Sequence, residues 1–476
     1  MKRLALLAIL LSLPIKLESQ IAAREYAQRR EALAARLPTS AVFVAFGARE
    51  PEHDYVEFYQ NPGMLYLTGV REPNAAFVLV RDGAMTSSAL FVEPRDPSTE
   101  VWSGARLGLA GATQLTGLPA RDAGQFRAFV DSLAASGKPF FVLGAISGQR
   151  GDSLARTPDD QFIAALKRAH PQLAVTNAAR IAQELRGRKT AAEMALLRRS
   201  IEITVQAHRE AMQHIRPGMH EYEIEAIVES VFRRNGAERP SFATIIGSGP
   251  NSTTLHYNAN DRLVQAGETI VMDIGSSYQG YAADVTRTVP LTGTYSPDQK
   301  AIYQIVRDAQ AAAERQAKPG APAQLMSDSA EAVLAAGLAR LGLIESATAT
   351  YDVAARDGIR TAPQYELFYM HGLGHGIGLE VHDPDQFYFT GTLAEGSAFT
   401  IEPGIYVRAD ALDYLADTPR NRAMIAKLKP MVAKYANIGV RIEDDYLVTD
   451  KGLEWVSRAP REISEIEALM KRRLTP

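Results

Sequence analysis

The sequence predicts an α/β domain followed by an α+β domain. In the first part of the chain, short apolar segments expected to be strands alternate with segments of helical period. The strands are expected at 41–46, 76–80, 89–92 and 139–143, and the helices at 24–37, 124–136 and 158–169. In the second part, long helical segments share the chain with apolar, β-branched runs that contain acidic residues. This change of pattern indicates two domains of different architecture.

A capping box marks the start of the second domain. The basic stretch RGRKT at 186–190 ends in Thr190, and Glu193 follows three residues later, which is the signature of a helix N-terminus. We expect this helix to end near His214, and further helices at 221–234, 297–317 and 322–341. The predicted domains therefore cover residues 21–186 and 187–476.

The composition is that of an ordinary globular protein. The 476 residues are enough for two substantial cores, with 46% hydrophobic and 22% charged residues. A net charge of −3 with scattered acids and bases gives no basic stripe, so nucleic acid is not an expected partner. The chain has no cysteine, which excludes disulfides, thiolate metal ligands and cysteine nucleophiles.

The N-terminus has the layout of a secretory signal peptide. Lys2 and Arg3 precede an apolar run from Leu4 to Leu13, which is too short to span a bilayer. We therefore expect residues 1–20 to be removed and the protein to be exported, periplasmic or secreted, with no membrane span left. The alternative is a cytoplasmic protein with a buried N-terminal helix, because no A-x-A box precedes the expected cleavage site.

Two aspartates lie in a predicted β-hairpin formed by 270–275 and 281–289. If the turn is centred between Tyr278 and Gln279, Asp273 lies opposite Asp284, with Cβ atoms roughly 5 Å apart. Such a like-charge pair destabilises a sheet unless a cation cancels the repulsion. If the hairpin turns elsewhere, both carboxylates are ordinary solvated side chains.

Two glutamates add to this pair. Glu402 and Glu443 stand within strongly β-forming apolar runs, where an unpaired carboxylate is costly. Together with the glycine-flanked His375 and the two aspartates, they make a plausible ligand set. Two divalent ions would neutralise four carboxylates, and oxygen-rich ligation with one imidazole favours a metal such as Mn²⁺.

Two competing motifs fail in the segment HGLGHGIGLEVHD. Its glycines do not fit G-x-G-x-x-G, which excludes the dinucleotide fingerprint. His371 and His375 are four residues apart, as in the zinc helix H-E-x-x-H. However, no glutamate follows His371, and the intervening glycines disfavour a helix.

Five short segments, taken in order, resemble the pita-bread metallopeptidases of the aminopeptidase P and prolidase family. They are MDIG, ADVTRT, HGLGHGIGLEVHD, IEPGIY and RIEDD. The resemblance covers roughly residues 190–455. FYQNPGMLYLTGVREPNAAFVLV and FVEPRDPSTEVWSGARLG resemble the N-terminal domain of aminopeptidase P. The implied fold is an α/β N-terminal domain followed by an α+β pita-bread (creatinase/aminopeptidase-like) catalytic domain.

The resemblance implies a site with two divalent metal ions, Mn²⁺ above all, with Zn²⁺ or Co²⁺ as alternatives. Its implied ligands are Asp273, Asp284, His375, Glu402 and Glu443. Asp284 and Glu443 would bridge both ions, and a metal-bridging hydroxide would attack a peptide carbonyl. Glu402 would also carry the proton to the leaving nitrogen, although a purely metal-holding role stays open.

Four further residues match the substrate side of the family. His256 and His382 would hydrogen-bond the scissile carbonyl or its oxyanion. His371 would line the pocket beyond the scissile bond. Arg441 lies two residues before Glu443, hence on the same strand face, and would steer a substrate carboxylate or orient the ligands.

The expected activity is that of an Xaa-Pro aminopeptidase acting on peptides with proline at the second position. The alternatives are an Xaa-Pro dipeptidase (prolidase) and a metal-free binding relative of the same fold. The resemblance also implies a homodimer or homotetramer, with Trp102 as a candidate contact residue. Residues 411–436 form a longer spacer than the family suggests, and a lid is one role for it.

Overall fold

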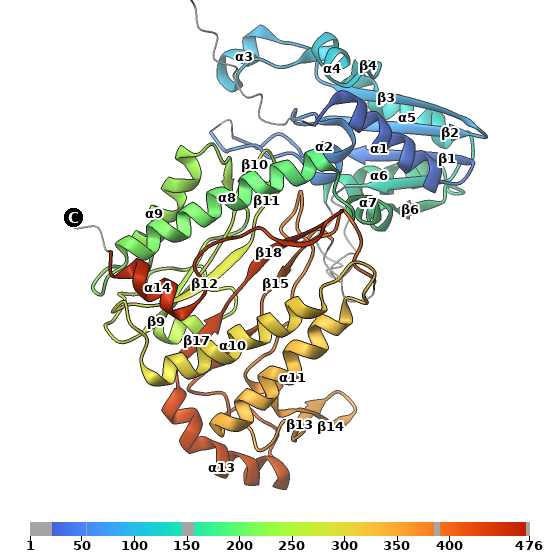
Figure 1. Cartoon of the computed structure of the whole chain (residues 1–476). Coiled ribbons are helices and arrows are strands. Elements are labelled where there is room, and N and C mark those ends of the chain that lie inside the picture. The colour runs from blue at the N-terminus through green and yellow to red at the C-terminus, as the bar shows by residue number, and fades with distance from the viewer. Residues whose placement is uncertain (1–20, 54, 145–156, 385–390, 473–476) are drawn as a thin grey trace, which may run out of the picture.

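A computed structural model of the protein describes residues 21–53, 55–144, 157–384 and 391–472. The expected signal peptide, residues 1–20, lies outside them. The chain forms two domains, with the N-terminal sheet placed at one end of the larger second domain (Figure 1). Within the described ranges, no helix combines the length and the hydropathy needed to cross a membrane.

The N-terminal domain is a six-stranded sheet in the order β4-β3-β2-β1-β5-β6. Its strands are β1 (Ser40–Phe46), β2 (Ala76–Asp82), β3 (Met85–Val92), β4 (Ala120–Asp122), β5 (Phe140–Leu143) and β6 (Val175–Asn177). Phe43 packs into one core and Val42 and Val44 into another, on opposite faces of the sheet. Burial on both faces explains why β1 reads as a continuous apolar run rather than an alternating one.

The described part of the N-terminal domain has seven α-helices, and all of them except α3, which has no buried residue, pack against the sheet. They are α1 (Ala23–Arg36), α2 (Pro62–Thr68), α3 (Pro97–Ser103), α4 (Gly108–Thr116), α5 (Phe126–Ala134), α6 (Pro158–Ala169) and α7 (Ala179–Arg186). The next helix, α8 (Ala191–His214), begins with the predicted capping box. The Thr190 side chain accepts from the Glu193 N–H, and the Glu193 carboxylate accepts from the Thr190 N–H at 2.9 Å.

The basic segment before α8 is not a solvated linker. Lys189 is buried, and its Nζ donates to the carbonyl oxygens of Arg186 and Asp383, both at 2.7 Å. The Arg186 guanidinium lies 2.9 Å from the Asp383 carboxylate. This segment therefore ties the domain junction to the stretch of chain that follows His375.

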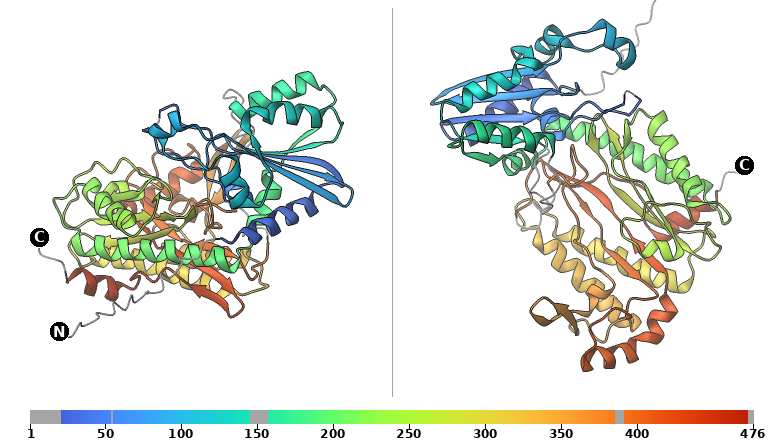
Figure 2. Two further views of the ribbon diagram at one scale, coloured as in Figure 1. Left: turned by 90° about the horizontal axis from the view of Figure 1, so that it is seen from above. Right: turned by 180° about the vertical axis from the view of Figure 1, so that it is seen from behind.

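The second domain consists of several short antiparallel sheets with helices on the outside (Figure 2). Its strands are β7 (Arg239–Pro240), β8 (Ile245–Ser248), β9 (Thr269–Ile274), β10 (Ser276–Tyr278), β11 (Tyr281–Ala282), β12 (Val285–Pro290), β13 (Thr350–Ala355), β14 (Gly358–Pro363), β15 (Ala398–Ile401), β16 (Gly404–Val407), β17 (Ile438–Arg441), β18 (Asp444–Thr449) and β19 (Gly452–Trp455). Its remaining helices are α9 (Glu221–Arg234), α10 (Pro297–Gln316), α11 (Gln324–Leu341), α13 (Pro419–Tyr435) and α14 (Ile463–Met470). Helices α10 and α11 lie side by side along one flank (Figures 1 and 2).

The 411–436 spacer contains helix α13. Its Asn421 exchanges two hydrogen bonds with the Asp352 backbone on β13, at 2.8 and 2.9 Å. Strands β16 and β17 pair from Gly404↔Arg441 to Val407↔Ile438, so the spacer is the loop of a hairpin. Figure 1 places α13 at the end of the molecule opposite to the N-terminal domain.

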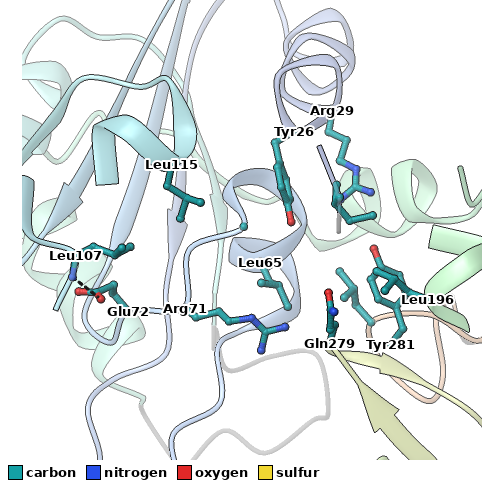
Figure 3. A pocket seen from close by; sticks show the side chains of 13 residues that line it. Tyr26, Arg29, Leu65, Arg71, Glu72, Leu107, Leu115, Leu196, Gln279 and Tyr281 are labelled. Carbon is teal, nitrogen blue, oxygen red and sulfur yellow. Dashed lines mark hydrogen bonds between the residues drawn. The ribbon is translucent and has the colours of Figure 1, made fainter. Parts of the chain in front are cut away.

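A cavity of about 370 Å³ lies where the two domains meet. Tyr26, Leu65 and Arg71 reach it from the N-terminal domain, and Leu196 and Gln279 from the second domain (Figure 3). Arg71 pairs with Glu238 across the junction at 2.7 Å. The N-terminal domain thus contacts the tip of the hairpin that carries the two predicted aspartate ligands.

Candidate metal centre

The hairpin turns one residue later than the sequence analysis assumes. Gln279 and Gly280 have φ angles of 51° and 86°, as the two central residues of a type I′ turn require. Tyr278 remains in its strand and pairs with Tyr281. Consequently Asp273 pairs with Thr286, and the predicted direct opposition of Asp273 and Asp284 is wrong. Asp284 precedes Thr286 by two residues, which places it diagonally to Asp273 on the same side of the hairpin.

The glutamates do not lie inside strands as the apolar runs suggested. Asp284, Glu402 and Glu443 each lie in a two-residue interruption: between β11 and β12, β15 and β16, and β17 and β18. The backbone N–H groups at these interruptions still have partners. The Glu402 N–H donates to Leu373 O at 2.8 Å, and the Glu443 N–H to Thr286 O at 3.1 Å. Neighbouring segments therefore fix the backbone of each ligand.

The structure brings the predicted ligands together. Asp284, His375 and Glu443 each offer a ligand atom, and these three atoms lie within 4.8 Å of one another. His375 Nε2 is 3.4 Å from Asp284 Oδ2 and 3.5 Å from Glu402 Oε1. The other ring nitrogen, Nδ1, is hydrogen-bonded to Gly376 O at 3.1 Å. This bond orients the imidazole with Nε2 towards the carboxylates, as metal-binding histidines require.

The site is electrostatically unfavourable without cations. Burial, followed by repulsion from neighbouring carboxylates, raises the pKa of Asp284 and of Glu443 well above their usual values. Burial also raises the pKa of Glu402 to about 8, although Arg441 opposes this. Among the described residues, the buried Oδ1 atoms of Asp273 and Asp284 have no hydrogen-bond partner. Unpartnered carboxylate oxygens beside an imidazole fit hard or borderline divalent cations.

Arg441 is buried beside the cluster and orients a ligand. Its Nη2 donates to Asp273 Oδ2 at 2.5 Å, and its Nε donates to Thr286 Oγ1 at 3.2 Å. The Thr286 hydroxyl in turn donates to Glu443 Oε2 at 2.6 Å. Of the two roles expected for Arg441, this geometry favours orientation of the ligands over capture of a substrate carboxylate.

Tyr406 is a member of the site that sequence reasoning missed. Its hydroxyl accepts from Arg441 Nη1 at 2.9 Å and is hydrogen-bonded to His371 Nε2 at 2.8 Å. Burial, with the charge of Arg441, lowers the pKa of His371 to about 3, so this imidazole is neutral. The position of Tyr406 in IEPGIYV, four residues after Glu402, was the only available signal.

His256 and His382 lie at the solvent side of the cluster, and both are exposed. The rings of His382 and His375 have centroids 3.9 Å apart. The residue before His256, Leu255, accepts through its carbonyl oxygen from Arg441 Nη2 at 3.4 Å. All the residues proposed from the sequence thus gather around one centre, with the carboxylates buried and two histidines at its mouth. This arrangement is that of a metal-dependent hydrolase.

Comparison with known proteins agrees with this class. The model of metallopeptidase family M24 matches residues 195–450, and that of the aminopeptidase P N-terminal domain matches residues 26–141. The chain therefore belongs to metallopeptidase family M24 and, within it, to the aminopeptidase P family, which confirms the predicted fold and family.

Two curated relatives span nearly the whole chain. The Xaa-Pro aminopeptidase of Escherichia coli is 32% identical over 466 residues, which cover 95% of this chain and 98% of the relative. That of Haemophilus influenzae is 33% identical, with coverage of 94% and 97%. Among solved structures, a variant of E. coli aminopeptidase P in complex with substrate has a TM-score of 0.78 at 29% identity, covering 95% of this chain and 99% of that one. Aminopeptidase P II from Yersinia pestis has a TM-score of 0.78 at 30% identity, covering 95% and 100%.

Proposed function

We propose that this metallopeptidase is a dinuclear-metal Xaa-Pro aminopeptidase, which hydrolyses the bond before a proline in the second position of a peptide. The observation that carries the proposal is the convergence of four carboxylates and one imidazole on a single buried centre below two exposed histidines. The named activity of the E. coli and H. influenzae relatives supports the substrate class.

The proposed ligands of two divalent ions are Asp273, Asp284, His375, Glu402 and Glu443. Mn²⁺ is the favoured ion because oxygen ligands predominate and the chain has no thiolate to offer. When bound, two such ions supply a Lewis acid for the peptide carbonyl and a water of lowered pKa. Elemental analysis of protein purified from its native host tests the identity of the metal, and zinc or cobalt at two equivalents would replace manganese in this proposal.

The side chains around the centre have distinct proposed roles. Glu402 accepts a proton from the attacking water and passes it to the leaving nitrogen. His256 and His382, at the mouth, hydrogen-bond the scissile carbonyl as it becomes an oxyanion, and removal of one oxyanion-hole donor from a serine peptidase costs about 3–4 kcal/mol. Tyr406 and Arg441 hold Asp273 and the neutral His371 in position.

Hydrolysis of the bond before proline places an additional requirement on the proposed active site. An Xaa-Pro bond is a tertiary amide without an N–H, so it cannot be anchored through that hydrogen. The leaving nitrogen instead needs a proton delivered from a fixed position. In this structure Glu402 lies close to His371, with 3.7 Å between Glu402 Oε2 and His371 Nδ1. We place the proline of the substrate on the His371 side of Glu402.

Peptide length tests the assignment. The metal-loaded protein is expected to release alanine from Ala-Pro-Ala and from longer peptides that begin Ala-Pro, measured as kcat/KM. Cleavage of the dipeptide Ala-Pro alone would assign the protein as an Xaa-Pro dipeptidase. Absence of cleavage with Mn²⁺, Zn²⁺ or Co²⁺ for every proline peptide would favour the metal-free binding relative.

We also propose that the protein is exported and that cleavage after Ser19 or Gln20 removes its N-terminal segment. The support is the Lys2–Arg3 pair followed by the apolar run up to Leu13. Sequencing the N-terminus of protein from its native host is expected to give Gln20 or Ile21 as the first residue. An intact Met1 on cytoplasmic protein would contradict export.

A further inference from the structure

A second cavity, of about 330 Å³, adjoins the metal centre at His371. Three tyrosines and two glutamates make up most of its wall: Tyr351 on β13, Tyr365 and Glu366 after β14, Glu331 on α11, and Tyr369. Because His371 also lies 3.7 Å from Glu402, the cavity is separated from the proposed proton carrier by one side chain. It therefore lies within reach of a bound peptide.

The cavity is acidic, and its two carboxylates form no ion pair with any described residue. Within the described ranges, neither Glu331 nor Glu366 has an ion-pair partner, and Glu331 only accepts from the Tyr365 hydroxyl at 2.9 Å. Burial, with repulsion from Asp328 and Glu366, raises the pKa of Glu331. The charge of Arg360 partly offsets the effect of burial on the pKa of Tyr351, but among the described residues Arg360 forms no ion pair with either glutamate. A cation that enters the cavity would relieve this repulsion.

Tyr369 provides an independent indication of a ligand. The residue is 3% exposed, and in the described part of the chain its hydroxyl has no hydrogen-bond partner. Its ring packs against that of His371, with centroids 4.9 Å apart, so Tyr369 lies beside the residue that separates the cavity from Glu402. A buried hydroxyl without a partner is unfavourable, and an N–H donor from a ligand would satisfy it.

We infer that this cavity is a subsite for the cationic side chain of a lysine or arginine in the peptide substrate. Two carboxylates supply the charge, and the tyrosine rings supply aromatic faces over which an ammonium or guanidinium binds favourably. The inference rests on the proposed function, which places the proline on the His371 side. The cationic residue is then the one that follows the proline.

Three peptides test the subsite with metal-loaded, full-length enzyme. Ala-Pro-Lys is expected to have a kcat/KM on the order of tenfold above that of Ala-Pro-norleucine, which keeps most of the stem but not the charge, and Ala-Pro-Glu is expected to be poorest. Lys-Pro-Ala and norleucine-Pro-Ala are expected to differ much less, because their charge lies on the other side of the scissile bond.

Charge-neutral variants locate the effect. Glu331→Gln and Glu366→Gln are expected to reduce the preference for Ala-Pro-Lys over Ala-Pro-norleucine while leaving hydrolysis of Ala-Pro-Ala intact. Glu366 is exposed, so its variant carries little risk for folding, and Glu31→Gln on the exposed face of α1 is the matched control.

Two results would overturn the inference: equal kcat/KM for the lysine and norleucine peptides, or a lysine preference that survives in both glutamine variants. Failure to cleave any proline peptide would be a different result, since it would remove the proposed function itself. A lysine preference found only before the proline would also contradict the placement of the subsite.

Discussion

At the scale of one residue, Asp284 illustrates the unfavourable burial of charge that the proposed metal ions would offset. Its carboxylate is buried, its Oδ1 has no partner in the described chain, and three other carboxylates of the proposed centre raise its pKa. The cluster thus lowers the stability of the metal-free protein, and a bound cation reverses the effect.

Asp284→Asn tests this charge balance. In the presence of chelator, the variant is expected to be more stable than the wild type by about 1–3 kcal/mol, because one buried charge is gone. It is also expected to lose turnover and most of the stabilisation by Mn²⁺. Urea unfolding with chelator and with Mn²⁺ measures both effects. Equal stabilisation of both proteins by Mn²⁺ would show that Asp284 is not a ligand.

His208 on α8 predicts a pH dependence that is separate from the metal. It is fully buried, and its Nε2 is hydrogen-bonded to Val285 O at 2.9 Å. Burial, then the charge of Arg287, lowers its pKa from 6.5 to about 3. Between these values the unfolded chain binds the proton and the folded protein does not, so this contribution to stability is present above pH 6.5 and is lost as the pH falls towards 3.

The measurement compares the wild type with His208→Gln in chelator. Between pH 7.5 and 5.0, the wild type is expected to lose about 2 kcal/mol more unfolding free energy than the variant. The carboxylates of the metal centre titrate in both proteins, so the difference isolates His208. Parallel pH profiles would disprove its role.

The sequence predicted which residues belong to the candidate site better than it predicted their contacts with one another. The five proposed ligands were selected because four of them are carboxylates in or beside apolar runs, and because the flanking words resemble a known family. Thr286 and Tyr406 lie within the same words, but threonine and tyrosine are ordinary strand residues and do not stand out there. Their functions depend on contacts with Glu443, His371 and Arg441, which are distant in sequence and meet only in the fold.

At the scale of elements, a buried ion pair fixes the interruption that carries Glu443. Arg287 on β12 is fully buried, donates from Nη1 to Glu443 O at 2.6 Å, and donates from Nη2 to Asp444 Oδ1 at 2.6 Å. Arg461 also donates to Asp444 Oδ2, at 2.9 Å. The two guanidinium groups hold β18 against β12, next to Glu443, which would hold metal as one of the five proposed ligands.

Asp444→Asn is therefore expected to destabilise the protein by about 3–5 kcal/mol, because it leaves buried guanidinium charge without compensation. Glu454→Gln, which breaks the more exposed pair of Arg198 with Glu454, is the control and is expected to cost less than about 1 kcal/mol. Chemical denaturation of the metal-free proteins measures both. Similar losses in the two variants would refute the role assigned to Asp444.

Element boundaries were predictable where the chain carries local signals. The expected ranges 158–169 and 221–234 coincide with α6 and α9, and Thr190 marks the start of α8, because capping interactions are local in sequence. Helix α13 was missed, since Pro430 lies within it and a proline normally ends a helix. The hairpin register was missed because Gln279, which is not a glycine, adopts a left-handed conformation.

At the scale of the whole molecule, two large apolar side chains of the N-terminal domain are exposed. Val101 and Trp102 on α3 are each 76% exposed, and Figure 1 shows α3 at the outer end of the N-terminal domain. We propose that this helix contacts another copy of the chain in a homodimer or homotetramer, because aromatic residues are enriched at such interfaces.

Trp102→Ser is expected to shift the protein towards monomer in sedimentation velocity experiments. Tyr414→Ser is the matched control, since Tyr414 is 83% exposed but belongs to the spacer whose helix α13 lies at the end of the molecule opposite to the N-terminal domain (Figure 1). A wild-type protein that is monomeric at micromolar concentration, or equal behaviour of the two variants, would contradict an interface at α3.

The pairing of β16 with β17 has an evolutionary consequence. Val407 pairs with Ile438, so the paired strands hold both ends of the intervening segment together, whatever the length of that segment. Glu402 and Glu443 lie at the end of the paired strands away from the loop. Helix α13 lies within the loop and is hydrogen-bonded to β13, which carries Tyr351. Insertions or substitutions in this loop can therefore change the wall of the proposed subsite without moving the proposed catalytic residues. Changes confined to this loop are therefore expected to alter the preference for the residue after proline and to leave the rate with Ala-Pro-Ala unchanged.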